Sequence, residues 1–315
     1  EYFKQLTAEK LMTRYIKGQP IREDGPQSHL SKAGTPTMGG LLILSALVFA
    51  TLVWARLDNP YIWIVLLVTL AFGGIGFADD YAKVTKQTTK GVSSRIRMLL
   101  GLLIAGLAAY AASSFHPAAL TGQLALPVFK DALVNLGWFY VPFGMFVIVG
   151  SANAVNLTDG LDGLSGGTMT FAWISYMVIA LLNAPGQVNL AIVCALIAGA
   201  LVGFLWFNVH PASVIIGDAG ALGFGAALAV TGLVTGHVLL LPLIGIIFVV
   251  ETGSVILQVA SVKLTGKRIF LFTPIHHHFE RLGWAETQIT FRFWIIGAIG
   301  GILGIVTFLA TRAQG

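Results

Sequence analysis

The chain has 315 residues, of which 56% are hydrophobic and only 10% are charged, and its mean hydropathy is +0.82. This composition excludes a typical soluble domain and indicates a polytopic membrane protein. The formal net charge of +5 suits a surface that meets anionic lipid head groups or phosphates. The single cysteine, Cys194, excludes an intrachain disulfide and a CxxC metal or redox site.

Nine apolar runs approach the length of a bilayer crossing. We therefore predict an all-α helical bundle that forms one integral membrane domain over residues 1–315, with its spans within 41–311. Residues 1–40 hold no apolar core long enough for a cleavable signal peptide, and we expect them to form a cytoplasmic segment. In chain order the runs are about 41–56, 61–78, 98–114, 138–157, 168–183, 189–207, 221–236, 238–261 and 293–311.

Basic residues set the orientation of these spans. Sixteen of the 19 Lys and Arg residues fall in connections on one side, and Arg56, Lys130 and Arg312 lie opposite. The rich side is therefore predicted to be cytoplasmic. Five aspartates and three consecutive histidines fall on this same side near helix ends, so we expect an active-site cleft there. The connections on this side are residues 1–40, 79–97, 158–167, 208–220 and 262–292.

Two adjacent aspartates, Asp79 and Asp80, close the second run. Like charges this close repel, so a cation, a proton or open water must lie between them. If the helix continues, Lys83 lies one turn away and brings an ammonium to the pair. The alternative is a helix end whose charges only mark the membrane interface.

Two further acidic clusters follow in the chain. Asp159 and Asp162, in "NAVNLTDGLDGLSGG", are spaced i, i+3 and are predicted to share one face of a polar break between two spans. Asp218, in "GDAG", lies just before an apolar run, where an N-cap is the alternative role. Carboxylates that converge without enough local lysines indicate a metal ion, and hard oxygen ligands favour Mg²⁺ over zinc.

The segment "TPIHHHFERLGW" offers a competing metal site. Three consecutive histidines cannot all bind one ion on a regular helix or strand, and the flanking Lys and Arg residues suit phosphate instead. A solvated basic loop is the alternative. The glycine- and serine-rich residues 22–40, with Lys32, could cradle a phosphate. Glu251, deep within a predicted span, is expected to join a structural hydrogen-bond network.

Taken in order from about residue 19 to residue 296, the motifs resemble one known family. "GTPTMGG", "FADDYAKV", "KGVSSR", "NAVNLTDGLDGL", "FLWFN", "GDAG", "GKRIFLFTPIHHHFE" and "RFWII" are similar to those of the bacterial phospho-N-acetylmuramoyl-pentapeptide transferases. The triple histidine separates this branch from relatives that transfer N-acetylglucosamine-1-phosphate. The resemblance implies a Mg²⁺-dependent enzyme of the bacterial inner membrane. It would transfer phospho-MurNAc-pentapeptide from UDP-MurNAc-pentapeptide to undecaprenyl phosphate, giving lipid I and UMP for peptidoglycan synthesis.

The resemblance also implies roles for particular residues. Asp79, Asp80 and Asp218 match the essential acidic trio, with Asp218 as a magnesium ligand and the other two as further candidate ligands. His277 matches a catalytic position in the loop that contacts the sugar-phosphate end. The matched substrate-binding positions are Lys32, Thr37, Lys83, Asn156, Asp159, Asp162, Asn208, His276 and His278, with Asn156, Asp159 and Asn208 on the nucleoside side. Membrane lipid and substrates are the expected partners, a homodimer is compatible with the family, and no nucleic acid is expected.

Two departures from the family pattern affect these expectations. The family has ten spans, whereas this sequence shows nine. Ile215 and Ile216 replace the aromatic residue and the methionine of the usual "FMGD" motif, so the grip on the uracil is expected to differ.

Two other classes remain as alternatives: a related UDP-N-acetylhexosamine-1-phosphate transferase, and a transporter for a divalent metal or phosphorylated solute. A transporter predicts acids on both sides of the midplane and an inverted repeat, and the sequence shows neither. A structural scaffold for cell-wall assembly does not explain why the acids converge. Direct attack by the lipid phosphate is favoured over a covalent aspartyl intermediate, because a phosphate is already a competent nucleophile.

Overall fold

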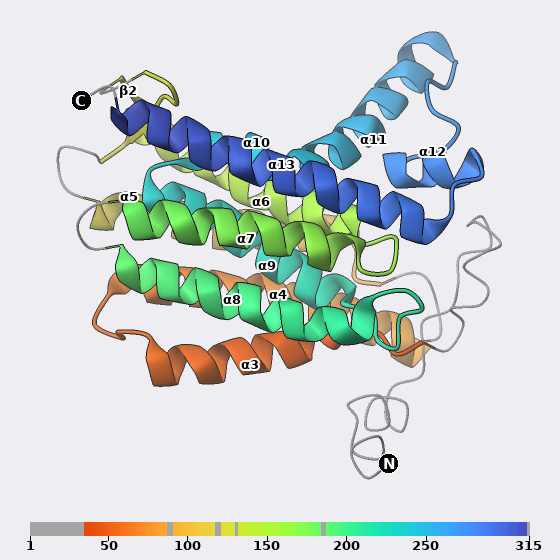
Figure 1. Cartoon of the computed structure of the whole chain (residues 1–315), viewed down its shortest axis with the longest axis horizontal. Helices are drawn as coiled ribbons and strands as arrows, with labels where there is room; N and C mark the ends of the chain where they lie inside the picture. Colours follow the sequence, from red (N-terminus) through yellow and green to blue (C-terminus); the bar gives the residue numbers. More distant parts are fainter. Residues whose placement is uncertain (1–34, 87–90, 117–120, 130–131, 184–186, 314–315) are drawn as a thin grey trace.

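The computed structural model describes residues 35–86, 91–116, 121–129, 132–183 and 187–313. Within these ranges the chain is almost entirely helical, as predicted (Figure 1). The long helices are α3 (Gly39–Trp54), α4 (Pro60–Lys86), α5 (Ser94–Phe115), α6 (Tyr140–Thr158), α7 (Leu164–Leu182), α8 (Val188–Asn208), α9 (Gly217–Thr235), α11 (Ile246–Thr265) and α13 (Glu286–Ala313). The short elements are β1 (Gln123–Ala125), β2 (Leu133–Asn135), η3 (Gly137–Phe139), η4 (Val238–Leu240), α10 (Leu241–Ile244) and α12 (Ile275–Arg281).

Eight helices among the described residues are long and apolar enough to cross a membrane, judged by length and composition. Each matches one of the nine predicted runs. The remaining run, 41–56, forms the 16-residue helix α3. At 1.5 Å per residue this helix rises about 24 Å, less than the hydrocarbon thickness of about 30 Å. Large apolar side chains such as Phe146 and Leu107 are 76% and 72% exposed on the outside of the bundle, as lipid contact requires.

The predicted run 238–261 is not one continuous helix, because its spanning helix α11 begins only at Ile246. The chain forms η4 and then the four-residue helix α10, with Pro242 in its first turn, and breaks at Gly245 before α11 begins. Proline suits a helix start because its missing N–H would have no partner there. Figure 1 shows the consequence: α11 leans away from the bundle and carries α12 with it.

Helix α9 forms the centre of the bundle. Of its 19 residues only Asp218 is not fully buried, and its neighbours include α4, α6 and α3. Glycines allow these helices to approach closely. A Cβ on Gly76 of α4 would collide with the backbone of Asp218, and a Cβ on Gly223 would lie 2.9 Å from the Thr69 carbonyl oxygen. The α4–α9 contact therefore brings the acidic ends of both helices together.

The polar connections gather at one end of the bundle, at the right in Figure 1. This end holds the α6–α7 turn, the α8–α9 loop and α12. At the opposite end β1 and β2 form a short antiparallel hairpin, with Leu124 opposite Val134, and Val128 donates a hydrogen bond to Thr311 of α13. The predicted convergence of polar residues on one end is therefore confirmed, while its cytoplasmic orientation stays a prediction.

Candidate active site

Asp79, Asp80 and Asp218 meet at the polar end of the bundle, with one carboxylate oxygen from each within 4.8 Å of the others. Asp79 and Asp80 lie in the last two turns of α4, which continues to Lys86 rather than ending near residue 78. Asp218 lies in the first turn of α9, and no side chain caps this helix, so the N-cap alternative for Asp218 is wrong. We call these three residues the acidic trio.

Two cations neutralise much of this charge. Lys83 Nζ lies 2.6 Å from Asp79 Oδ2 and 3.9 Å from Asp80 Oδ1, as the i, i+4 and i, i+3 spacings on a continuing helix predict. It also lies 3.0 Å from Asp218 Oδ2 of α9, a contact that helical spacing does not predict. Arg97 of α5 lies 3.2 Å from Asp79 Oδ2 and 3.4 Å from Asp218 Oδ2. The sequence indicated no role for Arg97, which follows the "KGVSSR" motif by two residues.

Backbone groups fix the trio further. The Val92 N–H donates to Asp79 Oδ1 at 2.8 Å, and the Ala219 N–H donates to Asp80 Oδ2 at 3.2 Å. Gly217 has a φ of +73°, and a Cβ there would lie 2.6 Å from Asp80 Oδ2 and 2.9 Å from the Thr37 hydroxyl. Glycine is therefore required at this position on both conformational and steric grounds. Thr37, a predicted substrate-binding residue, is buried beside the trio.

The donor set of the trio fits Mg²⁺. Three carboxylates supply hard oxygen ligands and leave coordination positions for water and phosphate. Among the described residues, Lys83 and Arg97 neutralise part of the charge of the trio. A bound Mg²⁺ would have to share or displace the contacts that Lys83 makes with Asp79 and Asp218.

Asp159 and Asp162 do not share one helical face, contrary to the prediction. Helix α6 ends at Thr158 and α7 begins at Leu164, so both aspartates lie in the intervening turn. Asp159 Oδ1 accepts a hydrogen bond from the Ser165 hydroxyl at 2.5 Å. Asp162 Oδ2 points to the α8–α9 loop, where it lies 3.0 Å from His210 Nδ1 and accepts from the Ala212 N–H at 3.1 Å.

One face of α13 forms hydrogen bonds with the turn between α6 and α7. Glu286, Thr290 and Trp294 are spaced four residues apart and therefore project from the same side of the helix. Glu286 Oε1 accepts from the Asp162 N–H at 2.7 Å, and the Thr290 hydroxyl donates to the Asp162 carbonyl oxygen at 3.3 Å. Trp294 Nε1 donates to the carbonyl oxygen of Gly163 at 3.0 Å. The sequence did not indicate this arrangement, because α13 is far from the turn along the chain.

The predicted nucleoside-side asparagines lie near the same turn. Asn208 is buried, accepts from the Gly163 N–H at 3.2 Å and donates to the Val214 carbonyl oxygen at 2.9 Å. Asn156 Nδ2 is buried without a hydrogen-bond partner among the described residues and could serve a ligand. Ile216 is fully buried and cannot stack on a base. Lys32, the remaining residue of the predicted set, lies outside the described residues.

The three histidines lie on the short helix α12 and have different partners. His276 is fully buried, with Nδ1 3.0 Å from Glu251 Oε2 of α11. His277 Nδ1 lies 2.5 Å from Glu280 Oε2, and His278 Nδ1 accepts from the Leu271 N–H at 3.2 Å. Their Nδ1 atoms therefore face three different partners, as the divergence of consecutive side chains on a helix predicts. The predicted hydrogen-bond role of Glu251 is also confirmed, although its partner lies 25 residues away rather than on the same helix.

His276 joins α12 to the α6–α7 turn. Its Nε2 is buried and has no hydrogen-bond partner in the part of the chain that the structure describes, and a Cβ on Gly160 would collide with this atom. A side chain that is 0% exposed cannot contact a substrate without a rearrangement. The prediction that His276 binds substrate directly therefore fits this structure less well than a role in positioning the turn.

A cavity of about 190 Å³ opens beside Arg97. Its wall is a mixture of polar and apolar side chains and comes from α4, α5, α6 and α9. The lining residues are Phe72, Ile75, Ser94, Arg97, Met98, Gly101, Val149, Asn153 and Leu222. Arg97 thus contacts the acidic trio and also lines this cavity within the bundle.

Comparisons with known proteins identify the family. The model of glycosyl transferase family 4 matches residues 62–236, and the phospho-N-acetylmuramoyl-pentapeptide-transferase signature 1 matches residues 32–44. A Ruegeria pomeroyi protein named phospho-N-acetylmuramoyl-pentapeptide-transferase is 56% identical over 304 residues, which are 92% of this chain and 84% of the relative. The chain belongs to the phospho-N-acetylmuramoyl-pentapeptide-transferases. A Dinoroseobacter shibae member of the same name is 54% identical over 313 residues, covering 94% of this chain and 86% of the relative.

Membership in this transferase family decides between the function classes left open by the sequence. The relatives' shared name favours the pentapeptide transferase over a related N-acetylhexosamine-1-phosphate transferase and over a transporter. The family 4 match contains the acidic trio, the α6–α7 turn and the α8–α9 loop, whereas α12 and α13 lie beyond it.

Proposed function

We propose that this chain transfers phospho-MurNAc-pentapeptide from UDP-MurNAc-pentapeptide to undecaprenyl phosphate, with lipid I and UMP as products. The acidic trio with Lys83 and Arg97 is the observation that carries the proposal. Phosphoryl transfer depends mainly on positioning and on charge neutralisation, and this cluster offers metal-binding oxygens beside two phosphate-binding cations. Mg²⁺ held by Asp218, with Asp79 and Asp80 as further ligands, would neutralise charge on the phosphate oxygens.

In the proposed reaction an oxygen of the lipid phosphate attacks the β-phosphorus of the nucleotide sugar. The bond from that phosphorus to the bridging oxygen breaks, and the electron pair leaves with UMP. Lys83 and Arg97 are placed to attract the phosphate oxygens. Asp79, bonded to both cations, would orient them toward the lipid phosphate.

The remaining predicted residues have places in this proposal. The α6–α7 turn with Asp159 and Asp162, together with Asn156 and Asn208, would receive the nucleoside. Thr37 and Lys83 lie beside the trio, and Lys32 is proposed to reach the phosphates. His277 and His278 on α12 would meet the sugar-phosphate end. The cavity beside Arg97, with apolar side chains such as Phe72, Met98 and Leu222 in its wall, supports the placement of the lipid phosphate at this cation.

The direct test is UMP release by the purified full chain in detergent, with both substrates present. We expect UMP with Mg²⁺ and none with EDTA. Asp218→Asn should abolish release, because it removes a charge at the metal while keeping the side-chain shape. Asp58→Asn is the matched control, since Asp58 is exposed and paired only locally with Arg56. UMP release by Asp218→Asn, or release that persists in EDTA, would contradict the assignment.

The proposed location is the bacterial inner membrane, with the acidic trio facing the cytoplasm. It is supported by the distribution of Lys and Arg. Thr265→Cys, at the end of α11, should react with a membrane-impermeant thiol reagent only from the cytoplasm. Thr121→Cys, next to the β hairpin, should react from outside. The opposite labelling pattern would reverse the orientation.

A further inference from the structure

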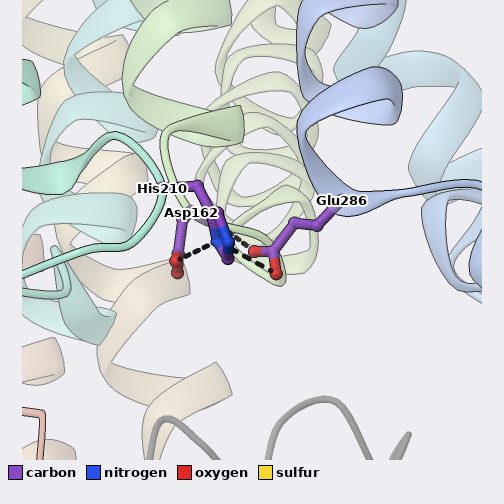
Figure 2. Close-up of side chains that lie close together, drawn as sticks. All are labelled: Asp162, His210 and Glu286. Carbon is purple, nitrogen blue, oxygen red and sulfur yellow. Dashed lines mark hydrogen bonds and ion pairs between the residues drawn. The ribbon is translucent and has the colours of Figure 1, made fainter.

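A second cluster of metal-ligating side chains lies apart from the acidic trio. His210 of the α8–α9 loop points between two carboxylates, as Figure 2 shows. Its Nδ1 lies 3.0 Å from Asp162 Oδ2 and 3.5 Å from Glu286 Oε2. Asp162 comes from the α6–α7 turn and Glu286 from the first turn of α13, so three separate segments of the chain meet at one imidazole nitrogen.

The burial of the three side chains is uneven. The Asp162 and Glu286 side chains are only 5% and 10% exposed, whereas the His210 side chain is 42% exposed. Two buried carboxylates that face each other need positive charge between them. The His210 side chain is partly exposed, so the cluster lies near the protein surface, where an ion and a water molecule can reach it.

The distances suit a small transition-metal ion. Zinc binds imidazole nitrogen and carboxylate oxygen at about 2.0–2.2 Å in a tetrahedral arrangement, which places neighbouring ligand atoms roughly 3.3–3.5 Å apart. The separation of 3.0 Å between His210 Nδ1 and Asp162 Oδ2 lies just below this range, and that of 3.5 Å between Nδ1 and Glu286 Oε2 lies at its upper end. One ligand atom from each residue lies within 4.8 Å of the others. The cluster thus supplies three protein ligands and an open fourth position.

The donor chemistry differs from that of the trio. The trio offers only oxygen and already contacts Lys83 and Arg97, so it suits a hard ion such as Mg²⁺. The second cluster adds a nitrogen donor, which suits ions of the zinc class. The three histidines of α12 are less suited to bind one such ion together, since their Nδ1 atoms have three different partners.

We propose that Asp162, His210 and Glu286 form a binding site for one divalent transition-metal ion of the zinc class. The ion would join the α6–α7 turn, the α8–α9 loop and the start of α13. In this state His210 binds through its Nδ1 lone pair, its ring proton lies on Nε2, and a water molecule takes the fourth position. Glu286 Oε1 can keep the hydrogen bond from the Asp162 N–H while Oε2 binds the ion.

The competing explanation is a metal-free bridge. A separation of 3.0 Å also fits a hydrogen bond, and a protonated His210 could neutralise both carboxylates by itself. The two explanations differ in one measurable property. A metal-free bridge binds no ion at all. A metal site binds one ion and loses it when its nitrogen ligand, His210, is removed.

Cobalt(II) is a suitable probe, because a four-coordinate nitrogen and oxygen site absorbs visible light much more strongly than a six-coordinate oxygen site. The full chain in detergent is stripped with EDTA, freed of chelator and titrated with Co²⁺ in the presence of excess Mg²⁺, which saturates all-oxygen sites. We expect one Co²⁺ per chain with an intense band, displaced by Zn²⁺. His210→Ala should weaken binding by at least about 100-fold, since losing even an outer partner of a ligand costs 10–100-fold.

Two further variants control the result. Glu286→Gln keeps a hydrogen-bond acceptor for the Asp162 N–H but removes the charge, and it should also weaken Co²⁺ binding. His277→Ala should leave the band unchanged. Thermal unfolding of each metal-free variant checks that the variant is folded. If His210→Ala is not folded, Glu286→Gln takes its place as the test of Co²⁺ binding.

The proposal is overturned if the wild type shows no intense band, if His210→Ala retains it, or if His277→Ala removes it. Likewise, if elemental analysis finds zinc in the wild type and in His210→Ala but not in His277→Ala, the zinc site lies on α12. No substrate is present in this experiment, so its failure leaves the proposed transferase activity untouched.

Discussion

Lys83 is the side chain on which the charge balance of the acidic trio depends most. Its Nζ lies within 3.9 Å of an oxygen of each of the three acids. Asp79 and Asp80 are almost fully buried, so water cannot replace the ammonium. Lys83→Met keeps the long apolar stem and removes only the charge, leaving Arg97 beside Asp79 and Asp218.

Removing one partner of a buried ion pair destabilises a protein by about 3–5 kcal/mol. The Lys83 side chain is 19% exposed and Arg97 remains, so we expect the lower end of that range, about 3 kcal/mol. At roughly 2 °C per kcal/mol for a chain of this size, the Tm in EDTA should fall by about 6 °C. Mg²⁺ should restore most of the loss in the variant, because it neutralises the same carboxylates.

The assay is thermal unfolding of the purified chain in detergent, followed by tryptophan fluorescence with EDTA or Mg²⁺. Lys86→Met is the matched control, because Lys86 is exposed at the end of the same helix. The reasoning is refuted if Lys83→Met unfolds in EDTA at the wild-type temperature. It is also refuted if Mg²⁺ raises the Tm of the wild type and the variant equally, since the ion would then not compensate for the missing ammonium.

Three further outcomes are expected. His277→Ala should lower kcat/KM on the order of 10²-fold if the imidazole stabilises transition-state charge, and an unchanged value in the UMP assay would exclude that role. Gly160→Ala should cost about 1–3 kcal/mol, because its methyl group collides with a buried imidazole of α12. Gly150→Ala, inside α6 with open space around it, should unfold at or slightly above the wild-type temperature, because alanine is favoured over glycine within a helix. Burial, and secondarily the charge of Arg312, lowers the pKa of His237 to about 4 from its usual value near 6.5. The neutral form is therefore favoured in the folded state, and stability present above about pH 6.5 should be lost as the pH falls toward 4, by roughly 2 kcal/mol at pH 5. A Tm that falls equally in the wild type and in His237→Gln between pH 7 and pH 5 would show that other groups control this loss.

The sequence by itself determined the fold class and the local geometry of the acidic pair. A bilayer offers no hydrogen-bond partners to the backbone, so long apolar runs must become helices, and eight of nine runs did so at spanning length. The contact between Lys83 and Asp79 follows from helical spacing alone and was predicted for the same reason. The separate directions of the three histidines also follow from helical geometry.

Predictions made from helical residue spacing were wrong where the backbone is not helical. Asp159 and Asp162 would share a face on a helix, but Gly160 and Gly163 belong to a turn that sends the two carboxylates to different partners. The run that begins at residue 238 looked continuous because residues 238–250 are apolar apart from Pro242 and Gly245, and hydropathy alone does not reveal a break at Gly245.

Only the tertiary structure decided which distant side chains complete each cluster. Arg97 reaches the acidic trio from α5. Glu286 of α13 reaches Asp162 of the α6–α7 turn, although it follows Asp162 by 124 residues in the sequence. Membrane helices that are apolar on all sides carry little periodic signal to show which neighbour each face meets. Their packing is set instead by close contacts at small residues such as Gly76, where α4 crosses the start of α9. Helical spacing fixes contacts within a turn or two of chain, whereas these long-range contacts exist only because the packed bundle holds the ends of its helices together.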